Sequence, residues 1–355
     1  MKRGLILGAI VASGLAAACA TQPGATESAA VGAATVANAT GIATTPMDSP
    51  PPGYAPASGP GLPGVSPIEH VAGNVYKIFG GGGNTLVFVM SDGVALVDTK
   101  LPNFGEQILA EVRKVTDKPI TTVINTHSHP DHVGSNQFFK DQRPTVAVIA
   151  QANSAARMAQ ATGPFPANPA TRSFDDHMTL GSGNDRIELH YYGPGHTNGD
   201  TFVVIPAAKT AMLGDIMAWS MAPLIDPGSG GSAVKAADTM ERLVRTVKGV
   251  DTIVEGHGYI QPWQRLVDFA AFNRALVEES KRVQAAGGQP KDVVTALIAS
   301  GKHAPFLKDH TLTGLEYGST GRNRALINAM VAFKELKGEK PEIIMNLPPD
   351  QGYKP

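Results

Sequence analysis

The sequence has almost no cysteine: Cys19 is the only one among 355 residues. A disulfide needs two thiols, so none can form within the folded part of the chain. Thiolate ligands are excluded there as well. Any transition-metal site must therefore use histidine, aspartate or glutamate side chains.

An excess of either charge is also missing. The chain has 30 Lys and Arg against 31 Asp and Glu, which gives a formal net charge of -1. Nucleic-acid binding depends on a basic surface, so this composition gives no support for a nucleic-acid partner. No Ser/His/Asp or Cys/His arrangement typical of nucleophilic catalysis stands out, and no motif indicates a protein partner. We expect a small-molecule substrate.

The apolar run at the N-terminus, residues 4–18, is too short to span a bilayer stably. It follows Lys2 and Arg3 and ends at small residues. This pattern is typical of a secretory signal peptide, which we place at residues 1–20. We therefore expect the protein to be exported.

Two interpretations of the cleavage site stay open. Ala18-Cys19-Ala20 fits the small-x-small rule, whereas residues 15–19 resemble a bacterial lipobox with Cys19 as the lipidated residue. Ala16 departs from the lipobox pattern, which usually has leucine there. We favour the lipobox, because the single cysteine lies at the end of the apolar run. The protein is then periplasmic, with possible membrane attachment as an outer-membrane lipoprotein.

Three further regions follow the signal peptide. Residues 21–66 consist mainly of Ala, Thr, Gly, Pro and Ser, with too few large apolar side chains to offset the cost of ordering, so they predict a flexible tether. Residues 67–261 predict a catalytic domain, and residues 262–345 predict a helical extension packed on it.

Short apolar runs bounded by turn residues predict the strands of the catalytic domain. They are Val75–Phe79, Thr85–Met90, Val94–Asp98, Ile120–Asn125, Thr145–Ala150, Arg186–Tyr192, Thr201–Ile205, Thr210–Leu213 and Asp251–Val254. Helical spacing is found around Ile108–Val115, Ala152–Gln160 and Met240–Val247, with Ser232 where an N-cap belongs. The alternation of strands and helices predicts an α/β fold.

The extension is predicted to be helical almost to its end. Apolar residues recur at helical spacing at Leu266, Phe269, Phe272, Leu276 and Val283, and again at Leu326, Met330, Phe333 and Leu336 before Gly338. Glu278 is one turn from Arg282, so we expect these two side chains to pair.

The segment THSHPDHVGS, residues 126–135, gathers His127, His129, Asp131 and His132 within six positions. Packing gains nothing from adjacent titratable groups, and neighbouring imidazoliums repel, whereas neutral imidazoles around a cation do not. Pro130 excludes the interior of a regular helix. In an extended segment His127 and His129 share one side, and the chain is expected to turn after Pro130 and present Asp131 and His132 to a second ion.

Three later residues each follow a predicted strand and a glycine: His196 in GPGHT, Asp215 in LGDIM and His257 in EGHGY. Taken singly, each is a weak signal, because polar residues after strands are often turn residues. Their recurrence at strand ends, where loops from different strands converge, makes them candidates for the remaining ligands.

His-x-His-x-Asp-His, then Gly-His-Thr, Gly-Asp and Gly-His in that order resemble the metallo-β-lactamase superfamily from about residue 70 to about residue 260. The resemblance implies an αββα four-layer sandwich with the site at one edge between the sheets. It implies that His127, His129 and His196 hold one Zn²⁺, that Asp131, His132 and His257 hold the other, and that Asp215 bridges them. Iron or manganese are possible in place of zinc.

The chemistry expected from that resemblance is hydrolysis by an exported dizinc enzyme. Two cations about 3.5–4 Å apart can share a hydroxide, with Asp131 orienting it or carrying its proton as the catalytic residue. The substrate is an ester, lactone, thioester or amide, with a β-lactam kept open. Lactamases that use a zinc-bound cysteine are excluded by the cysteine count, and all-histidine lactamases typically lack the aspartate that Asp215 provides.

Two alternatives stay open: a mononuclear iron enzyme like the superfamily's sulfur dioxygenases, and a tethered, non-catalytic metal-binding protein. Several residues also keep two interpretations. Asp98 either orients a ligand histidine or caps a turn, Asp200 either supports the site loop or stabilises a turn, and the apolar residues of segment 217–225 either cover the pocket or pack in the core. His70, His177, His190, His303 and His310 match no motif and are expected to be structural or surface residues.

Overall fold

The computed structural model describes residues 64–160, 168–308, 320–342 and 352–353. The predicted signal peptide, Cys19 and nearly all of the predicted tether lie outside these residues, as does His310. Among the described residues, no helix is long and apolar enough to cross a membrane.

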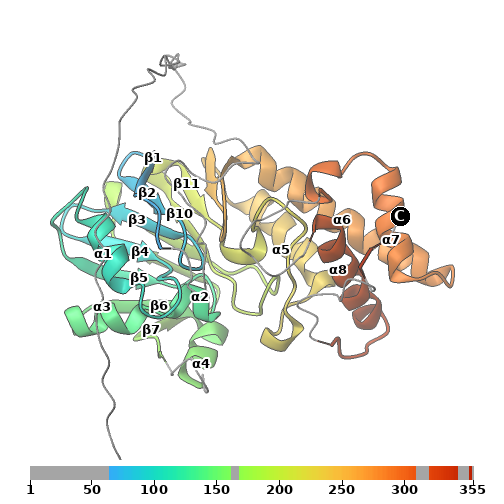
Figure 1. The fold of residues 1–355 in the computed structure, drawn as a ribbon, viewed down its shortest axis with the longest axis horizontal. Helices are drawn as coiled ribbons and strands as arrows, with labels where there is room; N and C mark the ends of the chain where they lie inside the picture. Colours follow the sequence, from blue (N-terminus) through green and yellow to red (C-terminus); the bar gives the residue numbers. More distant parts are fainter. Residues whose placement is uncertain (1–63, 161–167, 309–319, 343–351, 354–355) are drawn as a thin grey trace, which may run out of the picture. The chain divides into compact units, whose positions relative to one another are not determined.

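Two β-sheets form the centre of the fold (Figure 1). The first has seven strands in sequence order: β1 (Glu69–Ala72), β2 (Val75–Ile78), β3 (Thr85–Val89), β4 (Val94–Val97), β5 (Ile120–Ile124), β6 (Ala147–Gln151) and β7 (Arg172–Phe174). Strands β1 to β4 are antiparallel, and β4 to β7 are parallel. The second sheet has the order β13 (Ile260–Pro262), β12 (Thr252–Val254), β11 (Thr210–Met212), β10 (Phe202–Ile205), β9 (Ile187–His190) and β8 (His177–Leu180).

The sheets pack face to face because alternate residues of their strands point to the shared core. Leu86 and Phe88 of β3 and Val203 and Ile205 of β10 belong to one buried cluster between the sheets. The residues between them, such as Val87, point to the opposite face. Both faces of these strands are buried, which is why the sequence shows continuous apolar runs rather than polar alternation.

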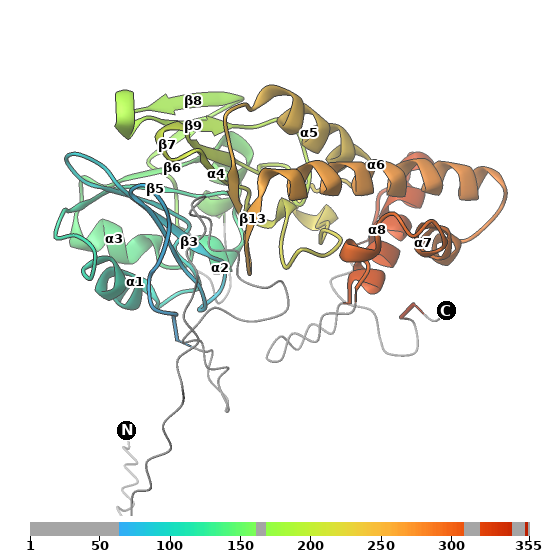
Figure 2. The ribbon, with the colours of Figure 1, turned by 90° about the horizontal axis from the view of Figure 1, so that it is seen from above.

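Helices cover the two outer faces, so the fold has the four αββα layers that the resemblance implies. The first sheet is covered by α1 (Gly105–Val112), α3 (Asn136–Gln142) and α4 (Ala152–Gln160), as Figure 2 shows from above. The second sheet is covered by α5 (Ala233–Thr246) and α6 (Trp263–Ala285). Ser232 caps α5 as predicted, because its hydroxyl accepts a hydrogen bond from the Lys235 N–H.

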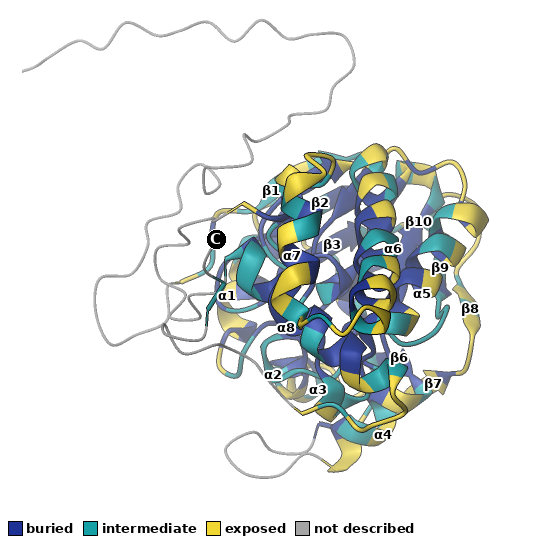
Figure 3. Cartoon of the chain, turned by 90° about the vertical axis from the view of Figure 1, so that its right-hand side faces the viewer, coloured by how far each residue is buried: buried dark blue, intermediate teal, exposed yellow. Residues whose placement is uncertain are grey.

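The C-terminal helices α6, α7 (Pro290–Ala299) and α8 (Gly321–Leu336) share one apolar cluster with the outer face of the second sheet. Phe269 and Phe272 of α6 and Phe306 meet at the centre of this cluster. Figure 3 shows the helices with buried residues facing inward and exposed residues facing solvent. Strand β13 runs across the predicted boundary between residues 261 and 262, and that division into domains stays a prediction.

Some local predictions are wrong. Strands β1, β7, β8 and β13 were not expected from the sequence pattern, whereas helix α7 lies in the region that was predicted to be helical. Arg282 pairs with Glu279 rather than with Glu278, which lies instead beside Lys281 and Arg274. Both spacings place side chains within reach on a helix, so neighbouring charges decide between them.

Candidate metal centre

All seven candidate ligands lie in segments that follow strands of the two sheets. The loop after β5 carries His127 and His129, and α2 (Pro130–Val133) carries Asp131 and His132. The other three are His196 between β9 and β10, Asp215 after β11 and His257 after β12. The segment does turn after Pro130, and the turn is a one-turn helix that begins there.

Proline favours this first helical position, because its missing N–H has no partner there and its fixed φ fits the helix. His129 is the N-cap, with an extended backbone at φ -68° and ψ 146°. The short helix brings Asp131 and His132 to a second group of candidate ligands, and the His132 ring remains beside the His127 ring, with a centroid distance of 4.1 Å.

The first group of converging side chains consists of His127, His129 and His196. Their ring centroids are 4.7–4.8 Å apart in all three pairs. The nearest ring nitrogens, His196 Nε2 and His129 Nδ1, are 3.0 Å apart. His127 and His196 are buried, whereas the His129 side chain is 20% exposed.

The second group consists of Asp131, His132 and His257. Asp131 Oδ2 is 3.1 Å from His257 Nε2, and the Nε2 atoms of His132 and His257 are 3.3 Å apart. The side chain of His132 is fully buried and that of Asp131 is 30% exposed. Solvent and substrate can therefore reach this group from the Asp131 side.

Asp215 lies between the two groups. Its Oδ1 is 3.3 Å from His132 Nε2, and its Oδ2 is 3.3 Å from His257 Nε2 and 3.9 Å from His196 Nε2. His127, His132 and Asp215 also form a triad with converging ligand atoms. One carboxylate thus faces both groups, as the resemblance implies for a bridging ligand.

Hydrogen bonds behind the rings turn nitrogen lone pairs toward the centre. The Thr126 hydroxyl donates to Asp98 Oδ2 at 2.7 Å, so its oxygen accepts from His127 Nδ1 at 3.0 Å. His132 Nδ1 donates to the same Asp98 oxygen at 2.7 Å. The Nε2 atoms of both rings are therefore unprotonated in the neutral state and face inward. Of its two interpretations, Asp98 fits the one in which it orients a histidine.

His196 and His129 are held in the same way by a single loop. His196 Nδ1 donates to the Leu224 carbonyl oxygen. His129 Nε2 donates to Asp226 Oδ2 at 2.9 Å, which leaves His129 Nδ1 as the inward acceptor. The Asp226 N–H also donates to the His196 carbonyl oxygen, so Asp226 contacts two members of the first group. The sequence analysis did not identify Asp226 as a site residue. It lies in the segment IDPGSGG, where an aspartate before Pro-Gly indicates only a turn.

These contacts fit divalent cations. His127 Nε2 and Asp215 Oδ1 are buried and have no hydrogen-bond partner, and the inward nitrogens of His129 and His196 face each other as acceptors. Acceptors without donors are costly in a buried site unless a cation lies between them. Nitrogen and carboxylate oxygen are the ligand types that zinc accepts.

The electrostatics of the groups differ. Burial and the neighbouring histidines lower the pKa of His127 well below its usual value and that of His196 to about 4. For His132 and His257, burial opposes the charge, but Asp215 and Asp131 outweigh it and raise the pKa of His257 to about 9 and that of His132 strongly. The second group therefore attracts positive charge and the first does not.

The glycines before the three later ligands are required by close packing. An added Cβ at Gly256 would lie 2.0 Å from Asp215 Oδ1, and one at Gly214, where φ is +57°, would lie 2.8 Å from Thr126. At Gly195 it would meet Ile216 at 2.4 Å. In the glycine run before Asn84, a Cβ at Gly83 would meet the His132 ring at 2.3 Å. These glycines allow the loops to approach one another.

The residues with two interpretations can now be placed. Asp200 accepts hydrogen bonds from the N–H and hydroxyl of Thr197, directly after His196, so it supports the site loop. Within segment 217–225, most side chains are buried in the core, and only Trp219 and Leu224 are partly exposed. Packing is therefore the main role of this segment.

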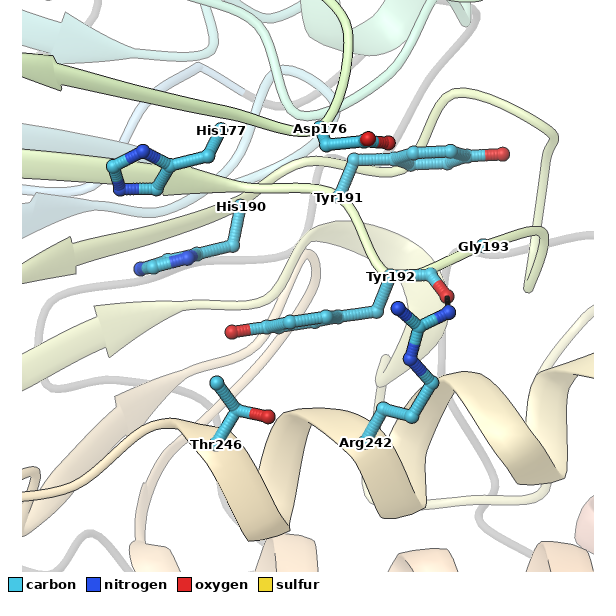
Figure 4. A pocket seen from close by; sticks show the side chains of 8 residues that line it. All are labelled: Asp176, His177, His190, Tyr191, Tyr192, Gly193, Arg242 and Thr246. Carbon is cyan, nitrogen blue, oxygen red and sulfur yellow. Dashed lines mark hydrogen bonds between the residues drawn. The ribbon is translucent and has the colours of Figure 1, made fainter.

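The four described histidines without a motif are in none of the groups of candidate ligands. His177 and His190 line a separate hollow of about 430 Å³ beside α5 (Figure 4). Burial, and then the nearby His177, lower the pKa of His190 to about 4, and its ring stacks on Tyr192 with a centroid distance of 5.6 Å. His70 contacts the Tyr76 ring, and His303 contacts the Phe272 ring.

Residues 78–218 match the family model described as "Metallo-beta-lactamase superfamily". The match includes the His-x-His-x-Asp-His segment, His196 and Asp215, so sequence and geometry agree. Residues 78–218 therefore belong to the metallo-β-lactamase superfamily.

Relatives within the superfamily have more than one activity. A metallo-β-lactamase type 2 from Bacillus sp. (strain 170) is 24% identical over 178 residues, covering 50% of this chain and 67% of the relative. A hydroxyacylglutathione hydrolase from Rhodospirillum rubrum is 26% identical over 244 residues, covering 66% of this chain and 86% of the relative. The metallo-β-lactamase structure from Pontibacter korlensis has a TM-score of 0.51 at 18% identity, covering 60% of this chain and 99% of that chain, and this likeness shows the fold alone.

The superfamily relatives are hydrolases, and this chain has side-chain clusters that can bind metal. The seven predicted ligands lie together. That they bind metal, and that the metal is zinc, stay predictions.

Proposed function

We propose that the chain is a dizinc hydrolase that cleaves an ester, lactone, thioester or amide-type bond. The observation that carries the proposal is the position of Asp215, whose oxygens lie 3.3 Å from His132 and His257 and 3.9 Å from His196. A site for one ion needs no second complete set of ligands. The additional group of Asp131, His132 and His257 therefore supports a pair of cations over a single iron.

When bound, such a pair lowers the pKa of water toward neutrality and polarises the bond under attack. The protein's own residues then position the reactants. Asp131 is the most exposed of the seven, and its carboxylate lies 3.1 Å from His257 Nε2. Although burial alone would raise the pKa of Asp131, His132 and His257 keep it below the usual range. Its ionised carboxylate can orient the attacking water and accept its proton.

Residues behind the ligands keep this arrangement in place. Asp98 holds His132, and Asp226 holds His129, so the reacting geometry does not depend on mobile imidazoles. Backbone contacts add to this: Gly83 N–H donates to the Asp131 carbonyl oxygen at 2.9 Å, and Asn84 N–H to that of Gly256 at 2.7 Å. The glycine-rich segment thus connects the loop of Asp131 with the loop of His257.

The substrate follows from the same residues and from the relatives. Asp215 favours the broader hydrolases over all-histidine lactamases, and the hydroxyacylglutathione hydrolase from Rhodospirillum rubrum supports an ester or thioester. The lactamase relatives keep a β-lactam among the substrates to be tested.

A panel of chromogenic esters, lactones, thioesters and β-lactams, applied to zinc-loaded protein, tests this function. We expect close to two zinc ions per chain by elemental analysis and turnover of at least one ester or thioester. One iron per chain, or turnover of nothing in the panel, would contradict the proposal.

The Asp131→Asn variant tests the role of the carboxylate in the same panel. A general base typically contributes about 10²–10⁴-fold, so we expect kcat to fall by about that factor. Asp141→Asn, an exposed aspartate on α3, is the matched control and should retain full activity. Equal activity in both variants would remove Asp131 from the mechanism.

We further propose export and lipidation at Cys19, supported by the sequence of residues 1–20 alone. In a bacterial host, the full-length chain should fractionate with membranes and incorporate a labelled fatty acid. Cys19→Ser should abolish the label. Label retained in Cys19→Ser would refute lipidation at this residue.

A further inference from the structure

Two consecutive residues beside the second group have an unfavourable backbone conformation. Trp219 has φ 59° and Ser220 has φ 50°, in the left-handed region that residues with a Cβ rarely adopt. Such conformations are unfavourable and persist only where the surroundings enforce them. Neither glycine nor asparagine relieves the cost here.

The surrounding contacts enforce this turn. Ser220 donates from its N–H to Glu255 Oε2 at 3.0 Å and from its hydroxyl to Glu255 Oε1 at 2.5 Å. Gln261 Nε2 donates to the Ser220 hydroxyl oxygen at 2.8 Å. The Trp219 N–H donates to the carbonyl oxygen of His257 at 3.0 Å. The turn is therefore fixed to the loop that carries His257.

The result is an indole placed on a candidate ligand. The Trp219 ring stacks on the His257 ring with a centroid distance of 5.8 Å and an interplanar angle of 27°. The Trp219 ring is also nearly perpendicular to the rings of Phe79 and Tyr259, with centroid distances of 5.7 Å and 6.4 Å. A Cβ at Gly258 would lie 2.8 Å from the indole, so this glycine makes room for it.

Trp219 is the part of this aromatic cluster that solvent reaches. Phe79 and Tyr259 are buried, whereas Trp219 is partly exposed. It adjoins His257, whose Nε2 is 3.1 Å from the carboxylate of Asp131, a side chain that is 30% exposed. A substrate that reaches Asp131 therefore finds an aromatic surface next to it.

We propose that Trp219 binds the apolar group of the substrate and selects esters or thioesters with an acyl chain of several carbons over acetyl or phosphorylated ones. This inference rests on the proposed function, because it concerns the same site. Trp219 is then a specificity-determining residue. The function of the strained turn is to hold the indole beside the acyl chain.

The chain offers a direct optical test, because Trp219 and Trp263 are its only tryptophans. Trp263, at the start of α6, packs against the helical cluster, so Trp263→Phe leaves Trp219 as the sole fluorophore. We would titrate the zinc-loaded variant with acetate and with hexanoate. Burial of part of a four-carbon extension should let hexanoate change the emission at a concentration about tenfold lower than acetate. Equal midpoints, or no change with either, would overturn the proposal.

Kinetics provide the second test. The ratio of kcat/KM for 4-nitrophenyl hexanoate to that for the acetate should fall about tenfold in Trp219→Ala, mainly through KM, with zinc content unchanged. Trp219→Phe, which keeps an aromatic surface, should retain most of the preference. Trp263→Phe is the matched control and should behave as the unaltered protein. An unchanged ratio in Trp219→Ala would refute the role of Trp219.

The two tests separate this inference from the proposed function. The optical test needs no turnover and keeps Trp219 in place, so it decides the inference even if Trp219→Ala does not fold. Selective hexanoate binding without hydrolysis of any ester would refute the hydrolase and retain the binding role of Trp219. Hydrolysis without a preference for longer acyl chains would refute the binding role of Trp219 and retain the hydrolase.

Discussion

The two groups of candidate ligands use opposite means to prepare for a cation. In the first group, the imidazoles are held by Thr126, Leu224 and Asp226, which fix the inward lone pairs without placing a full negative charge at the centre. In the second group, Asp131 and Asp215 bring negative charge directly to the ligand atoms. The comparison teaches that one half of the site is prepared by hydrogen bonds and the other by charge.

Asp215 is the residue that the two groups share, so its substitution should have the largest effect. Asp215→Asn keeps the shape but removes the charge between the groups. We expect zinc content to fall from about two to about one per chain and activity to fall more than about 100-fold, beyond the loss typical of residues behind the ligands. Elemental analysis and kinetics with the same ester measure both. Two tightly held zinc ions in this variant would contradict the claim that both groups depend on Asp215.

Asp226 tests the first group alone. In Asp226→Asn the His129 ring loses its charged acceptor, and affinity for the first cation should fall by about 10–100-fold, with the second cation retained. Competition with a chromogenic chelator measures the two affinities separately. Asp251→Asn, an exposed aspartate far along the chain, is the control. Equal weakening of both cations would show that the groups are not independently prepared.

The pH dependence of the metal-free protein tests the second group. The folded-state pKa of His257 is about 9, above the ordinary 6.5, because Asp215 and Asp131 outweigh burial. A raised histidine pKa stabilises the fold fully below pH 6.5, and this contribution is lost as pH rises toward 9. His127 and His196, whose pKa values are lowered, titrate below this window.

We therefore expect the free energy of unfolding of chelator-treated protein to decrease by about 1–3 kcal/mol between pH 6.5 and 9. Urea denaturation at both pH values measures it. Zinc-loaded protein should show a smaller decrease, because the cations replace the imidazolium charge. A metal-free protein equally stable at both pH values would show that the second group does not depend on positive charge.

Much of the fold could be predicted because most strands are apolar on both faces. The runs that form β2 to β6 and β9 to β12 were all recognised within a few residues of their ends. The missed strands lack that signal: β7 has a single buried residue, β8 alternates exposed and half-buried residues, and β13 has only three residues. Their pairing depends on neighbouring strands, which a local pattern does not contain.

The candidate site shows the same division. His127, His129, Asp131 and His132 were recognised because four potential ligands within six positions have no packing explanation. Asp226 and Trp219 have no such signal, since each is a single residue in a loop. Only the folded chain shows that Asp226 accepts from His129 and that Trp219 stacks on His257.

The sequence by itself determined which chemistry is available: one cysteine excludes thiolate ligands, and the motif residues supply imidazole and carboxylate. The periodicity of its apolar residues predicted an α/β fold, and the resemblance carried by its motifs implied the αββα layers. The tertiary structure decided which nitrogen of each ring faces inward and which group carries the charge. Those properties depend on hydrogen bonds and burial between residues as far apart as Asp98 and His132, or His129 and Asp226, and such distances are set only when the sheets pack.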